Sequence, residues 1–482
     1  MTTGTAVPQI GHLIGGEASV SSLRDVHDPG RLSDIVAQVA AGNAHDVDLA
    51  VGAAHAAFPA WRDTPSAERV QRLQAAAEVV AASSEELAPL LVREHGGVLW
   101  EAAADFALGA AVLKHTASLV EDFLRPVQYD DKQCFISVEK VGRGVAAAVV
   151  PWNMPVVLAM MKLAPALATG NTLVLKPSPF ASAALTLLLQ KIAGDLPAGV
   201  VNVVHGEHDV GAALCSHRLV RKVAFTGGTA TGSRVIEATA PTITNVTLEL
   251  GGNDPAIVLS DVDIDAALDR MLNGIFARTG QICFAIKRVY VARSIYQQFA
   301  DALCDRVNQY AVGHGLDPQA SFGPLNNETQ YNKVLNLLER TRNSSATVLE
   351  LGRKLDPSSW ANGYYMLPHV VRDVEHSAPL SCEEQFGPVI PLIAYDNEEQ
   401  VISWANDGNY GLCSSVWTTD PGRGLAMARR IEAGSTFINA HSFEALDLRM
   451  PFGGIKQSGL GREYGAAGLS AYVEEHAIRW LK

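Results

Sequence analysis

The fold class is decided by residues 144–176, whose sequence is GVAAAVVPWNMPVVLAMMKLAPALATGNTLVLK. Two short apolar runs in this stretch, Gly144–Val150 and Thr172–Lys176, have the length and composition of strands that are buried on both faces. Three further runs follow, with helix-length segments between them. The runs are Val200–Val204, Val223–Thr226 and Thr247–Leu250, and the segments include Ala181–Ala193 and Thr229–Ala238. Strands that alternate with helices predict a parallel, doubly wound α/β sheet.

The same stretch contains the most apolar part of the chain, but it does not have the pattern of a membrane span. Between Val145 and Thr169 it is interrupted by Pro151, Asn153, Pro155, Lys162 and Pro165. A spanning helix needs about 20 predominantly apolar residues with few or no charges. We therefore expect buried core close to a functional site, and no membrane partner.

A second α/β cycle begins near Asn253. It contains an apolar run at Ala256–Leu259, a helical pattern at Ile264–Phe276, a run at Arg288–Val291 and another helix from Ser294. This repetition predicts a second α/β domain. The cleft between two such domains is the natural site for a ligand.

The first third of the chain has helical periodicity instead. Apolar side chains recur at helical spacing in Ser66–Ala82, and the following Ser83-Ser84-Glu85-Glu86 matches the capping box that begins a helix. We expect these helices to cover a sheet. The segments Gln133–Val141 and Ala471–Lys482 resemble partly exposed strands, which favours pairing with another subunit in a homodimer or homotetramer.

Composition excludes several classes of protein. With 482 residues and 48% hydrophobic side chains, the chain can bury the cores of two or three domains of roughly 100–200 residues each. The net charge of −13 and the lack of a basic run argue against nucleic acid as a partner.

Cysteine usage and the N-terminus indicate the compartment. The six cysteines, at positions 134, 215, 283, 304, 382 and 413, are far apart and lack zinc-ligand spacing, so we expect no metal site and a reduced, cytoplasmic protein. Residues Met1–Gly16 have neither a basic region nor an apolar region. A secretory signal is therefore not expected.

Three side chains have the chemistry of a covalent catalyst, although none is decisive alone. Cys283 follows a predicted helix in the run Arg278–Cys283, where a thiol is more often a small core residue than a nucleophile. Glu249 lies among apolar neighbours at the end of a strand, and burial there would raise its pKa as a general base requires. Asn153 also follows a strand. Its amide is able to donate to an oxyanion, but an asparagine there is more often a turn former.

A glycine turn indicates a nucleotide site. In Phe225–Gly232 a strand leads through Gly227-Gly228 into a helix, an arrangement that points backbone N–H groups at an anion such as a pyrophosphate. The segment lacks the full GxGxxG spacing and the GK[ST] of a P-loop. A nucleotide cofactor is favoured over ATP chemistry.

Together these residues resemble the aldehyde dehydrogenase superfamily, and the resemblance covers nearly the whole chain. The separation of Glu249 from Cys283 is that of the family's base and nucleophile. Several family motifs occur in the family's order, and the joint pattern is far more specific than any one of them. The motifs are Pro151-Trp152-Asn153, Lys176-Pro177-Ser178, Phe225-Thr226-Gly227, Glu249-Leu250-Gly251-Gly252, Gly280-Gln281-x-Cys283, Glu384-x-Phe386-Gly387-Pro388 and Pro451-Phe452-Gly453-Gly454-x-Lys456-x-Ser458-Gly459.

The resemblance implies two doubly wound α/β domains with a small β extension for oligomerisation. Residues 1–122 and 143–252 would form the cofactor-binding domain, and residues 253–455 the catalytic domain. Residues 123–142 and 456–482 would form the oligomerisation extension and the C-terminal tail.

The resemblance also implies a reaction, the oxidation of an aldehyde to a carboxylic acid with NAD or NADP. Cys283 would attack the aldehyde to give a thiohemiacetal and then a thioester, and Glu249 would be the base for hydrolysis. Asn153 would form an oxyanion hole together with the Cys283 backbone N–H. The residues implied at the cofactor are Trp152, Lys176, Ser178, Gly227, Gly228, Gly232, Glu384 and Phe386. Lys176 would contact the adenosine ribose, Gly227 and Gly232 the pyrophosphate, and Glu384 with Phe386 the nicotinamide ribose.

The aldehyde channel implied by the resemblance is mainly apolar, which favours an aliphatic or aromatic aldehyde as the partner molecule. Its residues would be Met154, Val157, Met161, Ile282, Phe284, Ser442, Phe443 and Phe452. Arg449 would be able to bind a substrate carboxylate, although an arginine in such a loop more often faces the solvent.

Two positions depart from the family's pattern. Pro179 stands where a glutamate often contacts the ribose and repels a 2′-phosphate, and Gly228 replaces a residue that is often serine. We expect use of NAD, or of both cofactors.

The alternatives are a CoA-acylating dehydrogenase, a cysteine esterase or hydrolase, and a catalytically silent structural protein on the same fold. Glu249 argues against the CoA-acylating enzyme because it supplies a base for water. The lack of a recognisable Cys/His pair argues against the hydrolase. The presence of Cys283, Glu249 and Asn153 together argues against a silent protein.

Overall fold

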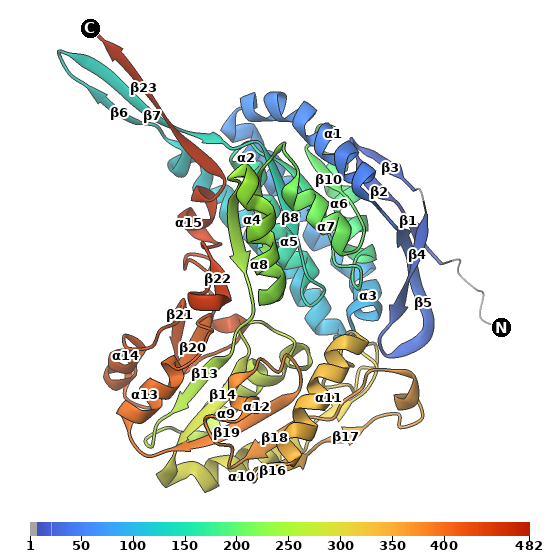
Figure 1. Ribbon diagram of the computed structural model, residues 1–482, viewed down its shortest axis with the longest axis vertical. Coiled ribbons are helices and arrows are strands. Elements are labelled where there is room, and N and C mark those ends of the chain that lie inside the picture. Colours follow the sequence, from blue (N-terminus) through green and yellow to red (C-terminus); the bar gives the residue numbers. More distant parts are fainter. Residues whose placement is uncertain (1–6, 21) are drawn as a thin grey trace.

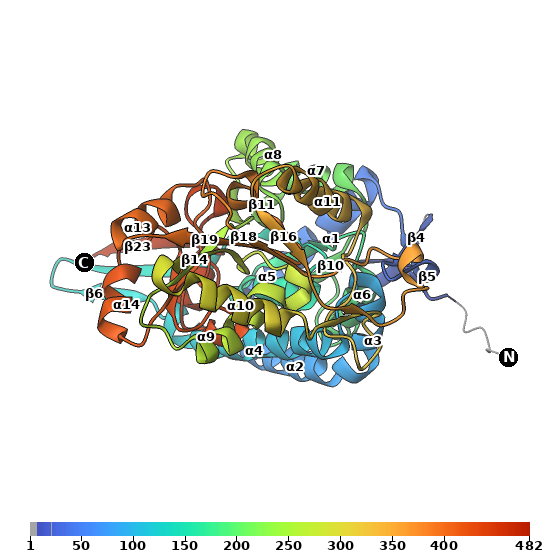
Figure 2. The ribbon, with the colours of Figure 1, turned by 90° about the horizontal axis from the view of Figure 1, so that it is seen from below.

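The structure, a computed structural model, describes residues 7–20 and 22–482. Figure 1 shows an upper α/β lobe, a lower lobe that begins with β13 (Asp254–Val258), and a β arm that projects from the upper lobe. From below, α7, α8 and α11 lie on one side of the strands and α2, α4 and α9 on the other (Figure 2). The predicted α/β class with two doubly wound sheets is confirmed.

The first sheet has eight strands in the order β22-β12-β11-β8-β9-β10-β2-β3. Its five central strands are parallel, and the edges at β2 and β22 are antiparallel. The central strands are β8 (Val145–Val149), β9 (Thr172–Lys176), β10 (Val201–Val203), β11 (Val220–Thr226) and β12 (Asn245–Glu249), with β2 (His12–Ile14), β3 (Glu17–Ser19) and β22 (Gly459–Leu460) outside them. The helices between the central strands are α5 (Pro155–Ala168), α6 (Ala183–Gly194), α7 (His208–Ser216) and α8 (Thr229–Thr239).

Helix α5 explains the apolar stretch that decided the fold, because every residue of it is buried. Its N-terminal N–H groups are satisfied by Asp105 of α4 (Leu99–Leu124), whose carboxylate accepts from Val156 N at 3.1 Å and from Val157 N at 2.8 Å. Helix starts leave such donors unpaired unless a side chain accepts from them. The buried carboxylate thus fixes the start of the helix that directly follows Asn153.

The second sheet has seven strands in the order β16-β18-β19-β14-β13-β20-β21, all parallel except β16. The predicted second cycle is present, and α9 has the predicted bounds. The further strands are β14 (Ile286–Ala292), β16 (Thr347–Glu350), β18 (His369–Arg372), β19 (Val389–Tyr395), β20 (Cys413–Trp417) and β21 (Ser435–Ile438), and β15 (Ala311–Val312) pairs with β17 (Arg353–Lys354). The helices are α9 (Ile264–Phe276), α10 (Tyr296–Val307), α11 (Glu328–Arg342), α12 (Pro379–Cys382), α13 (Glu398–Asn406) and α14 (Pro421–Ala428). The later helix α15 (Gly465–Ser470) packs instead against α4 and α5 of the first lobe.

The N-terminal third contains the predicted helices and a small sheet that the helical pattern did not predict. The helices are α1 (Ala44–Asp63), α2 (Ser66–Ala82), α3 (Ser84–His95) and α4, and the sheet has the order β1-β5-β4 with β1 (Gln9–Ile10), β4 (Leu23–Asp28) and β5 (Arg31–Ala40). The expected capping box at Ser83 is wrong. Ser83 has a helical backbone (φ −77°, ψ −11°) and its hydroxyl donates to the Val79 carbonyl at 2.7 Å, so it ends α2 instead of capping α3.

The β arm contains both segments that were predicted as exposed strands. β7 (Cys134–Gly142) pairs along its whole length with β23 (Val473–Leu481) and also with β6 (Val127–Asp130). Within one chain the two segments therefore pair with each other, and the edges of the arm are β6 and β23. Tyr129 and Trp480 are exposed on it.

In the described part of the chain, no single helix has the length and apolar composition to cross a membrane. The bent pair α3 and α4, at 118°, meets those criteria only when the two helices are taken together.

Candidate active site

The predicted site residues lie where the parallel strands of the first sheet end. Pro151-Trp152-Asn153 follows β8, Lys176 ends β9, Gly227 follows β11 and Glu249 ends β12. The carboxyl ends of parallel strands share one edge, where ligands of doubly wound sheets bind. The order of strands thus brings together motifs that are far apart in sequence.

Cys283 enters the site on a loop between α9 and β14. The loop turns through three consecutive left-handed residues, Arg278 (φ 55°), Thr279 (φ 59°) and Gly280 (φ 72°). A Cβ at position 280 would lie 2.3 Å from the Gly387 carbonyl oxygen, so only glycine fits there. The turn presents the half-buried Cys283 on the wall of a cavity.

The electrostatic setting of Cys283 favours the neutral thiol. Burial raises the pKa of Cys283 to about 12, and the negative charge of Glu249 adds to this, while Lys287 opposes it. The Lys287 ammonium donates to the Ile282 carbonyl at 2.5 Å and also reaches the Cys283 carbonyl at 3.4 Å. A base must therefore take the thiol proton when the sulfur attacks.

Asn153 is tied to the same loop. Its side-chain Nδ2 donates to the Gln281 carbonyl at 2.9 Å, and its own carbonyl accepts from Arg278 Nε at 3.0 Å. The amide nitrogen of asparagine carries two hydrogens. One therefore holds the loop and the second is available to an oxyanion.

Glu249 is a deeply buried carboxyl group without a hydrogen-bond partner among the described residues. Burial and the nearby Glu463 raise its pKa well above the ordinary value, while Lys162 and Arg462 oppose that shift. A Cβ at position 453 would lie 2.5 Å from Glu249 Oε1, so the carboxyl group faces Gly453. It does not line the Cys283 cavity in this conformation.

A buried ion pair lies beside Glu249. Lys162 Nζ contacts Glu463 Oε1 at 2.9 Å and donates to Thr226 Oγ1 at 2.7 Å. Removing one partner of such a pair is costly because the other charge is left buried. The pair holds a cation and a second carboxylate close to the predicted base.

Two cavities meet along the strand ends. One has a volume of about 590 Å³ and its walls include Lys176, Ser178 and α8. The other has about 230 Å³ and its walls include Asn153, Cys283 and Glu384. They share Pro151, Trp152, Thr226 and Gly227. This forms one long cleft that ends at the thiol, which suits a dinucleotide.

The Cys283 end of the cleft holds the side chains predicted to contact the nicotinamide half. Trp152 and Phe386 pack edge to face with ring centroids 5.7 Å apart, and the Lys287 ammonium lies 5.6 Å from the centroid of the Phe386 ring. Glu384 Oε1 accepts from the Gly252 N–H at 3.1 Å. Gln330 of α11 donates to the Phe386 carbonyl at 2.9 Å and fixes this wall.

Two glycines near the turn between the ends of the cleft differ in whether a side chain would fit there. A Cβ at Gly228 would meet no atom within 4 Å, whereas one at Gly232 would lie 2.7 Å from Leu250 Cδ2. Gly228 lines the cleft at the start of α8. Gly232 lines neither cavity, and its contact with a pyrophosphate stays a prediction.

The end of the cleft at Lys176, where the adenosine half is predicted to bind, contains charges that the motifs did not indicate. Burial lowers the pKa of Lys176 to about 8, while the negative charge of Glu207 opposes that shift. Arg24 of β4 donates to the Pro179 carbonyl at 2.7 Å and lies 3.5 Å from Glu207 Oε1. The Arg24 guanidinium therefore connects the Pro179 carbonyl with the Glu207 carboxylate. Glu207 lies on the wall of the cleft.

The predicted aldehyde channel is an aromatic and aliphatic cluster behind Cys283. The Phe284 ring centroid lies 5.2 Å from that of Phe443 and 5.8 Å from that of Phe452. The other apolar members belong to the same core cluster: Met154, Val157, Met161 and Ile282. Ser442 is buried, and its hydroxyl accepts from the Glu444 N–H.

Arg449 lies at the surface as expected. Its guanidinium donates to both oxygens of Asp447, with Nε at 2.9 Å and 3.1 Å, and its side chain is 82% exposed. Its charge is therefore already paired.

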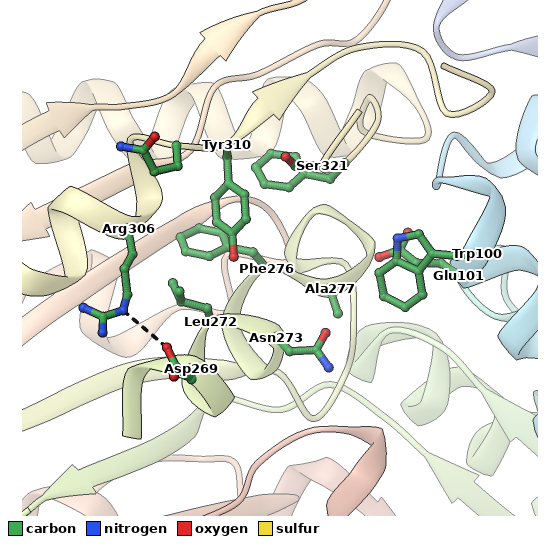
Figure 3. Close-up of a pocket in the computed structure, with 12 residues that line it drawn as sticks. Trp100, Glu101, Asp269, Leu272, Asn273, Phe276, Ala277, Arg306, Tyr310 and Ser321 are labelled. Atoms are coloured by element: carbon green, nitrogen blue, oxygen red, sulfur yellow. Dashed lines mark ion pairs between the residues drawn. The ribbon is translucent and has the colours of Figure 1, made fainter. Parts of the chain in front are cut away.

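A separate surface cavity of about 520 Å³ does not contain the predicted site residues (Figure 3). Its walls include Trp100 and Glu101 from α4 and Ala277 after α9, with an ion pair between Arg306 and Asp269. Ala277 directly precedes Arg278. This cavity thus borders the loop of the nucleophile without reaching the thiol.

Sequence reasoning missed Arg24, Glu207, Lys287, Gln330 and Lys333, all of which line the cleft or contact its walls. They come from β4, β14, α11 and the loop before α7. No motif marks them, because only folding brings them to the strand ends. Among the described residues, no group of three or more His, Cys, Asp or Glu side chains is placed to hold a metal ion.

Comparison with known proteins gives concordant matches. The family model described as "Aldehyde dehydrogenase family" matches residues 17–478. The chain is 36% identical to the alpha-ketoglutaric semialdehyde dehydrogenase of Bacillus subtilis (strain 168), with 95% of each chain covered. It resembles the crystal structure of a betaine aldehyde dehydrogenase from Staphylococcus aureus in complex with NAD+, with a TM-score of 0.93 at 31% identity and with 97% and 94% of the two chains covered. An NADP-dependent enzyme from E. coli matches with a TM-score of 0.92 at 34% identity and 98% coverage of both chains.

Proposed function

The chain belongs to the aldehyde dehydrogenase family, and we propose that it oxidises an apolar aldehyde to the carboxylic acid with NAD through a thioester on Cys283. One observation carries this proposal: Cys283 and Asn153 both line one end of a dinucleotide-sized cleft. The balanced reaction consumes aldehyde, NAD+ and water and yields acid, NADH and a proton.

The first step is attack of the Cys283 sulfur on the aldehyde carbon. The carbonyl oxygen becomes an oxyanion, and the free hydrogen of the Asn153 amide together with the Cys283 backbone N–H would stabilise it. The thiol proton must leave, because the pKa of Cys283 is raised to about 12. That proton passes to the solvent of the cleft and is the proton of the balanced reaction, while Glu249, whose carboxyl group faces Gly453 and not this cavity, acts in the hydrolysis step.

When it is bound, NAD supplies the acceptor for the hydride that leaves the thiohemiacetal carbon. Trp152, Glu384 and Phe386 would hold its nicotinamide half, and Lys176 with Ser178 its adenosine half. Gly227 and Gly228 would let backbone N–H groups approach a pyrophosphate at the start of α8.

Hydrolysis of the thioester needs Glu249 to turn. Its carboxyl group faces Gly453, and rotation towards the thioester would let it take a proton from the attacking water. Cys283 then leaves as the thiolate and the acid is released. A base held near an apolar pocket in this way favours hydrolysis over transfer to CoA.

The charges at the adenosine end support NAD as the preferred cofactor. Pro179 removes one family carboxylate, but Glu207 supplies another within reach of Lys176 and Arg24. A 2′-phosphate placed there would face the like charge of Glu207. With this placement, residues 143–252 are proposed to bind the cofactor and residues 253–455 to supply Cys283.

An uncharged apolar aldehyde is the proposed substrate class. The residues proposed for the channel include an aromatic cluster of Phe284, Phe443 and Phe452. The guanidinium of Arg449, which was considered for a substrate carboxylate, is paired with Asp447. A substrate carboxylate would have no free cation in the described residues of this wall, so the carboxylate-bearing semialdehyde of the Bacillus relative is expected to be a poor substrate.

We further propose a cytoplasmic homodimer or homotetramer. The exposed aromatic side chains and open edges of the β arm offer a surface for a second copy.

The experiment is NADH formation at 340 nm over a panel of aldehydes with NAD, NADP and added CoA. Aldehyde-dependent reduction that Cys283→Ala abolishes, with a free acid as the product, supports the proposal. Reduction that requires CoA would replace it by the acylating reaction, and ester hydrolysis without cofactor reduction would replace it by the hydrolase.

A further inference from the structure

Arg278 is a buried arginine for which the proposed mechanism has no use. Only 3% of it is exposed, and it begins the left-handed turn that leads to Cys283. A residue other than glycine is strained in that backbone region and persists there only where the surroundings enforce it. Its surroundings must therefore hold it firmly.

Three elements hold Arg278. Its backbone N–H donates to Glu101 Oε1 of α4 at 2.6 Å, and its Nη1 donates to His95 Nδ1 of α3 at 3.1 Å. Burial and the charge of Arg278 keep the pKa of His95 well below the ordinary value, so the neutral ring can accept. Its Nε and Nη2 both donate to the carbonyl of Asn153. Glu101 is also part of the wall of the surface cavity in Figure 3.

These bonds close a ring around the oxyanion donor. The guanidinium of Arg278 holds the Asn153 carbonyl, while three residues later the Gln281 carbonyl accepts from Asn153 Nδ2 at 2.9 Å. Both the backbone and the side chain of Asn153 are thus fixed by the loop that carries the nucleophile. A shift of this loop would move the thiol and the amide donor relative to each other.

Gly97 makes room for this arrangement. A Cβ at position 97 would lie 1.5 Å from Arg278 Nη1, so a side chain there would displace the guanidinium. The charges with the largest effect on the pKa of the Cys283 thiol are those of Lys287, Glu249, Asp254 and Glu384. The hydrogen bonds of Arg278 join the loop to Asn153, so its influence on the site is argued from geometry.

We propose that Arg278, accommodated by Gly97 and anchored by Glu101, is a positioning residue that fixes the Asn153 amide relative to the Cys283 sulfur. This inference rests on the proposed function, in which these two groups act on the aldehyde. Displacement of about 1 Å in such a site lowers the rate of the chemical step by about 10²-fold.

The first test is a double-mutant cycle read by the pre-steady-state burst of NADH. Arg278→Lys keeps the positive charge but loses the planar guanidinium that donates to the Asn153 carbonyl and to His95 at the same time. We expect the burst rate to fall about 10²-fold with the Kd of NAD unchanged. In the Asn153→Ala background the same change is expected to cost at most about twofold, because the donor that it positions is gone. Equal losses in both backgrounds, or no loss in either, would overturn the proposal.

The second test uses alkylation of Cys283 by iodoacetamide without cofactor. A freed loop should expose the Cys283 sulfur to solvent and relieve the burial that raises its pKa, so alkylation at pH 8 should accelerate at least about tenfold. Gly97→Ala should reproduce this result with Arg278 intact, which covers the case in which Arg278→Lys does not fold. Unchanged alkylation in Gly97→Ala would contradict the proposal.

Arg69→Lys is the matched control. Arg69 is also a buried arginine, and it donates to the carbonyls of Ala168 and Arg62, away from the thiol. We expect a lower melting temperature but a burst rate and alkylation rate within about twofold of wild type. If wild type itself forms no NADH from any aldehyde, the proposed function fails, and the alkylation rates still decide whether Arg278 and Gly97 hold the loop.

Discussion

Glu249→Gln should separate formation of the thioester, which yields NADH, from hydrolysis of the thioester. The amide has nearly the same size as the carboxyl group but cannot accept a proton from water. A positioned general base contributes about 10²-fold to 10⁴-fold to a rate. We therefore expect hydrolysis of the thioester, and with it steady-state turnover, to fall by about 10²-fold or more, while the Cys283 thioester accumulates.

The steady-state rate should also depend on pH through the protonation of Glu249, and the direction of this dependence follows from its raised pKa. Only the deprotonated carboxylate is a base, and burial together with Glu463 raises the pKa of Glu249 well above its ordinary value. Turnover limited by hydrolysis should consequently keep rising with pH in the wild type at values above the range in which an ordinary carboxyl group titrates. In Glu249→Gln that rise should be lost.

The assay is stopped-flow absorbance at 340 nm after mixing enzyme, NAD and benzaldehyde. The variant should show a burst that approaches one NADH per active site, followed by a slow phase. Glu94→Gln is the control, because Glu94 is equally buried but accepts from the N–H groups at the start of α6. An unchanged steady-state rate in Glu249→Gln would refute its role as the base.

Four further predictions follow from the cleft, the channel and the arm. Glu207→Gln should raise kcat/KM with NADP relative to NAD by about tenfold in a cofactor titration, since a like charge is removed; a fixed ratio would reject the role of Glu207. Phe452→Ala should raise KM for benzaldehyde by about tenfold but hardly for acetaldehyde, because an aromatic wall is lost. Trp480→Asp should lower the mass found by light scattering, and an unchanged mass would exclude the β arm as an interface. Asp105→Ala should lower the free energy of unfolding in urea by about 1–2 kcal/mol, because α5 loses its cap; equal stability would show that the cap is dispensable.

The α/β core was predictable because its strands and helices are encoded locally. The buried runs of β8 and β9 and the bounds of α2 and α9 follow from apolar periodicity alone. The small N-terminal sheet was not predicted, because β1, β4 and β5 are stabilised by pairing between segments that are distant in sequence. Ser83 met the capping pattern, but its helical backbone let the hydroxyl donate within α2 instead.

The site residues that belong to a sequence motif were predictable. Those that only the fold brings to the site were not. Cys283 and Asn153 follow from the ordered motifs, and the hydrogen bond from Asn153 to Gln281 ties Asn153 to the loop that carries Cys283. Arg24 and Glu207 reach the adenosine end from a β strand and a loop that no motif marks. The orientation of Glu249 towards Gly453 was also beyond sequence, since it depends on packing around the ion pair of Lys162.

The central claim is that Cys283 carries the acyl group, and peptide mass spectrometry after acid quench tests it most directly. Enzyme mixed with NAD and benzaldehyde should yield a Cys283 peptide heavier by one benzoyl group, in larger amount for Glu249→Gln than for wild type. Enzyme mixed with the aldehyde alone should not yield it, because the thiohemiacetal reverses. NADH formation without an acylated Cys283, or with the acyl group on another residue, would contradict the account.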